Sequence, residues 1–124
     1  MALDTPMISD GCQTVAGADL RTKQYYPVKL TAARTVGLAT TGGENIYGIL
    51  QNKPNTGDVA DVCIFGICKA IAGGTVTAGG AVMSEVTNGR IVDQTSTNAK
   101  IGVALEGATA ANQIISIKVI PTPG

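Results

Sequence analysis

The run VADVCIFGICKAI, residues 59–71, constrains the fold of this chain more than any other segment. In an extended strand, neighbours such as Val62 and Cys63 point to opposite faces, so both faces of this run are apolar. A strand of this kind is covered by other elements on two sides. Gly66 interrupts the run and predicts a bulge or a bend, and a corner there would let one strand serve two sheets or close a small barrel.

The rest of the sequence also favours strands over helices. Ile and Val together number 23, against 6 Leu, and β-branched side chains favour the pleated sheet. The 16 Gly separate short β-branched runs, a pattern typical of a compact all-β domain. We therefore predict an all-β fold, a small compact β-sandwich or barrel-like domain with an N-terminal extended arm. The predicted division is residues 1–24 for the arm and its lead-in, and 25–124 for the β-rich domain.

Alternating patterns predict further strands on both sides of the central run. Pro27 cannot donate a hydrogen bond to a neighbouring strand, which predicts that KQYYPVKLT is an edge strand. In NQIISIKVIP, the side chains of Ile115, Ile117 and Val119 share one face. The predicted strands lie within residues 23–31, 34–40, 46–50, 101–108 and 112–121.

Asn88-Gly89 is a strong local signal for a hairpin. This dipeptide between two β-rich segments is typical of a two-residue loop in a type I′ turn, which needs positive φ at both positions. Such a loop fixes the register of the strands that it joins. The predicted pairs are Val82 with Thr95, Ser84 with Asp93, and Val86 with Ile91.

Two segments of the chain resemble each other, NIYGILQNKPNTGDVADVCIFG from residue 45 and AKIGVALEGATAANQIISIKVI from residue 99. Gly48 aligns with Gly102, and Val62 then aligns with Ile117. We interpret the pair as two similar β-units, each a short strand with a buried glycine, a polar loop and a long strand; chance similarity in a biased composition is the alternative. The glycines expected at turns or close backbone approaches are Gly48, Gly66, Gly89 and Gly102.

Charge and composition exclude several classes of function. Nine Lys+Arg and nine Asp+Glu give a net charge of +0 without a basic stripe, so no nucleic-acid partner is expected. No apolar run approaches the roughly 20 residues of a membrane span, and no signal peptide is recognisable at the N-terminus. We therefore expect no membrane partner and synthesis in the cytoplasm.

The sequence offers little catalytic chemistry. It contains no histidine, which removes Ser-His and Cys-His nucleophile pairs and imidazole metal ligands. An odd number of cysteines without an export signal predicts reduced thiols at Cys12, Cys63 and Cys68, the last two as small buried hydrophobes. We predict that the protein is not an enzyme and has no catalytic, cofactor-binding or metal-binding residues; carboxylate or lysine chemistry in a small enzyme stays the alternative.

The segments GILQN, GDVADVCIFGICKAIAGGTVTAGGAVMSEVTNGRIVDQT and KIGVALEGATAANQIISIKVIP, taken in this order, resemble the capsid cement (decoration) proteins of tailed bacteriophages. The resemblance covers residues 36–121. It implies a homotrimer that binds the outer surface of an expanded capsid and cements the lattice of the major capsid protein, without catalytic residues or cofactors. Another virion part, such as a tail or fibre component, is the alternative.

The first twelve residues contain three apolar side chains among turn-forming residues, Leu3, Met7 and Ile8. Either an extended arm or a disordered terminus fits this segment. With the resemblance in mind, these three residues are candidates for contact with the capsid. We expect the arm to be loose in the free protein and ordered on the particle, where it would add a strand or a hook to its neighbour.

Overall fold

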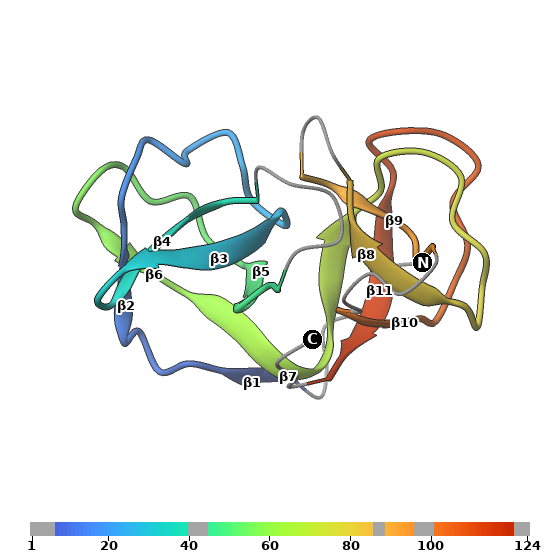
Figure 1. Cartoon of the computed structure of the whole chain (residues 1–124), viewed down its shortest axis with the longest axis horizontal. Helices are drawn as coiled ribbons and strands as arrows, with labels where there is room; N and C mark the ends of the chain where they lie inside the picture. The colour runs from blue at the N-terminus through green and yellow to red at the C-terminus, as the bar shows by residue number, and fades with distance from the viewer. Residues whose placement is uncertain (1–6, 40–44, 86–88, 96–100, 121–124) are drawn as a thin grey trace.

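The computed structural model describes residues 7–39, 45–85, 89–95 and 101–120 (Figure 1). None of them lies in a helix, so no helix among them could cross a membrane. The predicted all-β class is confirmed. The eleven strands among the described residues are β1 (Met7–Ser9), β2 (Thr14–Ala16), β3 (Pro27–Ala32), β4 (Thr35–Leu38), β5 (Gly48–Leu50), β6 (Val59–Ala60), β7 (Val62–Ile71), β8 (Ala81–Ser84), β9 (Ile91–Asp93), β10 (Gly102–Ala104) and β11 (Ile114–Val119).

The strands form two barrel-like lobes that share β7. They belong to one hydrogen-bonded sheet in the order β6-β2-β4-β3-β5-β7-β11-β10-β8-β9, with β1 attached to β7. The first lobe closes because β6 continues along the chain into β7. The second lobe closes through a bridge between Ala72, just after β7, and Ile91 of β9. Figure 1 shows the two lobes on either side of β7.

The predicted corner at Gly66 is confirmed. Gly66 has a φ of 98°, a conformation that glycine adopts without a steric penalty. Before the bend, β7 pairs with β5 through Val62 and Cys63; from the bend onward it pairs with β11. In Figure 1 the two arms of β7 form a V. One long apolar strand can therefore belong to both lobes.

The predicted two-sided burial of this strand is also confirmed before the bend, where Val62 and Cys63 are both fully buried. Val62 belongs to the core of the first lobe and Cys63 to that of the second, so the strand separates two apolar clusters. The first core comprises Ala16, Leu20, Val28, Val36, Leu50, Ala60 and Val62. The second comprises Ile49, Cys63, Cys68, Ala70, Ala72, Val76, Val82, Ile91, Ile101, Ala104, Ala108, Ile115, Ile117 and Val119.

The prediction of an edge strand at Pro27 is wrong. β3 pairs with β4 on one side and, through Pro27 and Val28, with β5 on the other. Pro27 is the first residue of β3, a position where a missing N–H group is tolerated inside a sheet. The proline therefore marks the start of an interior strand.

The predicted register of the β8–β9 hairpin is wrong by two residues. Val82 pairs with Asp93, and Ser84 pairs with Ile91. The Glu85 N–H donates to the Arg90 carbonyl at 2.8 Å, so residues 86–89 connect the strands instead of a two-residue turn. Asn88 lies outside the described residues, whereas Gly89 has a φ of 73°. Because side chains alternate with a period of two, the shift leaves each strand's inward face unchanged.

The two similar segments adopt the same arrangement. In the first, β5 runs antiparallel to β7 with Leu50 opposite Val62; in the second, β10 runs antiparallel to β11 with Ala104 opposite Ile117. These pairs coincide with the sequence alignment of Val62 with Ile117. A β-carbon on either Gly48 or Gly102 would collide with the backbone of the facing long strand, which explains the glycine in each unit.

Residues 7–9 of the arm, which was expected to be loose in the free protein, pair with another strand of the same chain. β1 runs antiparallel to β7, with Met7 opposite Gly66 and Ile8 opposite Phe65. The stretch of β7 around its bend offers unpaired backbone groups, and β1 satisfies them within the same chain. Leu3 lies outside the described residues. The division at residue 24 stays a prediction, although β1 and β2 both precede it and belong to the common sheet.

Candidate functional site

Ile8 and Phe65 form an exposed apolar pair at the bend of β7. They are direct cross-strand partners on β1 and β7, and their side chains are 53% and 40% exposed. Directly opposed residues on antiparallel strands have neighbouring side chains. Of the predicted capsid-contact residues, the structure thus places Ile8 on the surface beside Phe65, which is not among the predicted residues.

Asp10 holds the turn after β1 against β7 and against Tyr47, the residue before β5. Its carboxylate accepts hydrogen bonds from the Thr14 hydroxyl at 3.0 Å, the Tyr47 hydroxyl at 3.1 Å and the Cys12 N–H at 3.1 Å, and a longer one from the Val62 N–H at 3.5 Å. The Asp10 N–H in turn donates to the Val62 carbonyl at 2.9 Å. Asp10 is buried, so these donors take the place of water.

The same carboxylate affects the titration of Tyr47. Burial raises the pKa of the Tyr47 phenol, and its hydrogen bond to Asp10 and the negative charge of Asp10 raise that pKa further. Ser9-Asp10-Gly11 is typical of a turn. The turn is present, with positive φ at Gly11 and Cys12, but two partners of Asp10, Tyr47 just before β5 and Val62 of β7, lie 37 and 52 residues away.

Two further surface features lie on the first lobe. Val15 of β2 and Val59 of β6 are cross-strand partners and both are exposed, which makes a second apolar pair. An open groove of about 420 Å³ is lined by Lys29 and Leu30 of β3 and by residues 45–47. None of the described residues that line the groove carries a carboxylate.

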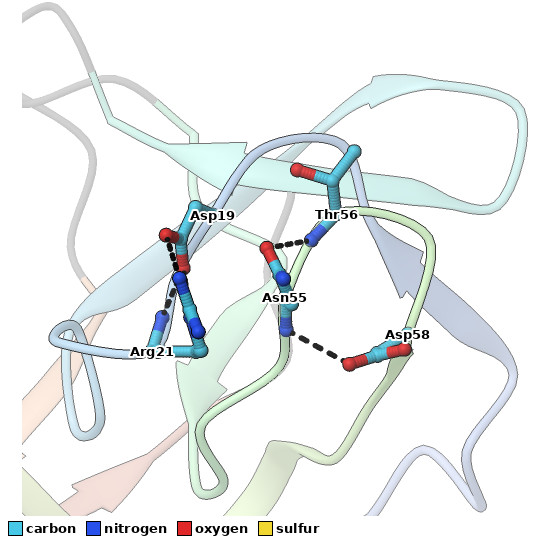
Figure 2. A network of polar contacts seen from close by, with 5 residues as sticks. All are labelled: Asp19, Arg21, Asn55, Thr56 and Asp58. Atoms are coloured by element: carbon cyan, nitrogen blue, oxygen red, sulfur yellow. Dashed lines mark hydrogen bonds and ion pairs between the residues drawn. The ribbon is translucent and has the colours of Figure 1, made fainter.

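Exposed polar contacts organise two neighbouring loops of the first lobe (Figure 2). Arg21 donates to both oxygens of the Asp19 carboxylate, at 2.8 and 2.9 Å, and these hydrogen bonds lower the pKa of Asp19 to about 2. In the facing loop the Asn55 N–H donates to the Asp58 carboxylate at 3.1 Å. Each set of contacts closes its own turn, which indicates a structural role.

A less exposed ion pair closes the β8–β9 hairpin in the second lobe. Arg90 Nε donates to Glu85 at 2.7 Å, and Arg90 also donates to the Asn112 side chain at 2.7 Å. This network joins the hairpin to the loop before β11. Among the described residues, no group of three or more Cys, Asp or Glu side chains is placed to hold a metal ion.

Comparison with known protein families shows that this chain is a phage structural protein. The chain belongs to the phage cement protein family, because the sequence model of that family matches residues 13–119. No curated protein matches the sequence.

Among solved structures, the fold is similar to that of the N-terminal base of the head fibre protein gp8.5 of bacteriophage phi29. The TM-score is 0.70, the sequence identity is 16%, and the similarity covers 92% of this chain and 94% of that one. At this identity the similarity shows a common fold and nothing further.

Proposed function

We propose that this protein binds the outer surface of an expanded phage capsid as a homotrimer and cements the lattice of the major capsid protein. Membership of the phage cement protein family is the observation that carries this proposal. Under this proposal the protein is made in the cytoplasm of the host bacterium and acts on the virion, and its role requires no enzymatic activity, cofactor, nucleic acid or membrane.

Cementing follows from mass action. A protein that binds only the assembled shell stabilises it by about 2.7 kcal/mol per site when its free concentration is a hundred times Kd. A trimer strengthens attachment, because once one copy is bound the other two bind at high effective concentration. Stabilisation over many sites would resist the outward pressure of packaged DNA.

The surface at the bend of β7 is the part of the chain that we assign to the shell. Ile8 and Phe65 expose adjacent apolar side chains on a rigid element, because β1 is hydrogen-bonded to β7 and held by Asp10. Exposed apolar pairs on an ordered scaffold are typical of interaction surfaces. Met7, another predicted contact residue, lies on β1 itself, and Leu3, the third, lies outside the described residues.

A second candidate is the capsid-proximal base of a head fibre. The common fold with the base of the phi29 head fibre favours it over a tail component. Imaging of particles distinguishes the two, because a cement protein forms repeated compact densities across the shell, whereas a fibre base continues into a projecting rod.

The experiment adds purified protein to expanded heads that lack it and images them by electron microscopy. We expect threefold densities on the outer surface and heads that withstand higher temperatures. Light scattering of the free protein tests the trimer separately. Failure to bind expanded heads, or binding without an effect on their stability, would contradict cementing.

Ile8→Asp and Val59→Asp make a matched pair for the surface. Both residues are about half exposed, on short strands of the same sheet. We expect Ile8→Asp to weaken attachment at least about tenfold, as loss of an apolar anchor does, and Val59→Asp to leave it unchanged. Equal effects of the two variants would exclude a specific role for the bend.

A further inference from the structure

The second lobe has an outer face, formed by β7 after its bend, β11 and β10, that carries exposed apolar side chains and two lysines. Along these strands, residues of the second core alternate with residues that point away from it. Lys69 lies between the core residues Cys68 and Ala70, and Lys118 lies between Ile117 and Val119, so both lysines belong to the outer face. The members of the outer face used below are Ile67, Lys69, Leu105, Ile114, Lys118 and Ile120.

The apolar part of the outer face is open to solvent. Leu105, Ile114 and Ile120 are 49%, 38% and 43% exposed, although alternation alone would allow polar residues at all three positions. Large apolar side chains that stay exposed together on a sheet are typical of an interaction surface.

The two lysines are close neighbours on the outer face. Lys69 lies directly opposite Ser116, and Lys118 lies two residues further along β11. Diagonal neighbours of this kind on antiparallel strands are about 7–8 Å apart, within reach of long side chains. Neither ammonium group has an ion pair or a hydrogen bond with a described residue. The outer face therefore holds two adjacent positive charges without a partner in the described part of the chain.

The described carboxylates of the second lobe already have other partners. Glu106 lies at the edge of the outer face, where its carboxylate accepts the Ser116 N–H at 2.8 Å. Glu85 and Asp93 bind their partners at the β8–β9 hairpin, through an ion pair and through hydrogen bonds. Two lysines and one glutamate leave the outer face with an excess of one positive charge. A surface that complements it would be acidic.

The outer face adjoins the bend of β7. Gly66 pairs with Met7 of β1 on one side and with Val119 of β11 on the other, so β1, the bend and the end of β11 lie side by side (Figure 1). The exposed pair of Ile8 and Phe65 lies at the same place. The surface assigned above to the shell thus extends onto the second lobe.

We propose that the outer face binds an acidic surface of the assembled capsid, with shell carboxylates opposite Lys69 and Lys118 and apolar shell residues against Leu105. This inference rests on the proposed function and specifies the chemistry of the partner. Charge complementarity orients the two surfaces and speeds their association. The same face of a second copy fits less well, because lysines would then oppose lysines, and like charges directly opposite each other are destabilising.

The test compares charge reversals in the full chain. Lys118→Glu reverses one charge of the outer face, and Lys53→Glu is the matched control, because Lys53 is also exposed but lies in a loop of the first lobe. Each protein is added to expanded heads that lack it, and the bound amount is measured in about 0.05 M and about 0.5 M NaCl. The Tm of each variant shows that it is folded.

We expect Lys118→Glu to weaken attachment about fivefold at low salt, since one attraction becomes a repulsion. The difference should shrink at high salt, because salt screens charges at the surface. Lys53→Glu should attach like the unsubstituted protein. Equal attachment of the two variants at low salt would overturn the proposal.

Cross-linking identifies the occupant of the outer face without a substitution. A water-soluble carbodiimide joins an amine to a carboxylate in contact with it and takes up the water that is lost. We expect mass spectrometry to find Lys69 or Lys118 linked to an Asp or Glu of the major capsid protein. The absence of such links, or links to a second copy of this chain instead, would overturn the proposal.

Failure of this inference is distinct from failure of the proposed function. If the unsubstituted protein does not bind expanded heads, the proposed function and this inference are both wrong. If it binds and stabilises them while Lys118→Glu attaches equally well, cementing stands and only the role of the outer face is refuted.

Discussion

Replacing Asp10 by alanine tests how β1 is held. The Asp10 carboxylate accepts hydrogen bonds from the Thr14 and Tyr47 hydroxyls at 3.0 and 3.1 Å and from the Cys12 N–H at 3.1 Å, while the 3.5 Å contact from Val62 contributes least. Hydrogen bonds to a charged group contribute about 1.5–3 kcal/mol each, and a buried donor left without a partner costs about 1–3 kcal/mol.

Not all of these contributions are lost in full. Thr14 is buried, so its hydroxyl loses its partner in a place that water reaches poorly, whereas Tyr47 and the exposed Cys12 can turn to solvent. We therefore expect Asp10→Ala to lower the free energy of unfolding by about 2–4 kcal/mol. At about 4 °C per kcal/mol for a chain of this length, the Tm falls by about 8–16 °C.

Urea unfolding followed by circular dichroism measures this change, and Asp10→Asn is the matched control. Asparagine keeps one acceptor oxygen, and its amide can donate to the two hydroxyls, so its cost should be about 1 kcal/mol. A Tm of Asp10→Ala within 3 °C of the parent, which is about 1 kcal/mol or less, would refute the view that Asp10 fastens β1 to the sheet.

Further predictions concern three other sites. Gly102→Ala should prevent folding or lower the free energy of unfolding by more than about 3 kcal/mol, because the new β-carbon would overlap the β11 backbone. The control Gly74→Ala should leave the Tm nearly unchanged, because its β-carbon meets no atom within 4 Å. The Ser84 hydroxyl is fully buried and has no hydrogen-bond partner among the described residues, so Ser84→Ala should raise the free energy of unfolding by about 1 kcal/mol in urea. A loss of stability would show that the hydroxyl is satisfied. The folded protein holds the Tyr47 proton more tightly than the unfolded chain does. This difference stabilises the folded state below about pH 10, and the stabilisation is lost as the pH rises further. Tyr47→Phe should therefore show a shallower loss of stability above pH 10 than the parent, and identical pH profiles would contradict the raised pKa.

Part of the candidate site could be predicted from the sequence, because it depends on local patterns. Ile8 was selected as an apolar residue in a polar segment, and the structure exposes it. Phe65 was missed, because it was assigned to a buried face; alternation along a strand does not show where the covering element ends. Asp10 was missed because its partners Tyr47 and Val62 are distant in sequence.

The sequence by itself determined the all-β class, the corner at Gly66 and the equivalence of the two glycine-containing units. These features follow from side-chain branching, from alternation with a period of two and from backbone conformations that only glycine adopts easily, all of which act within a few residues. Tertiary structure alone decided the partner of β1, the interior position of β3 and the length of the hairpin loop. Each is a choice among pairings that satisfy the same local pattern, and the free energy that decides between them comes from backbone hydrogen bonds and packing between segments far apart in the chain.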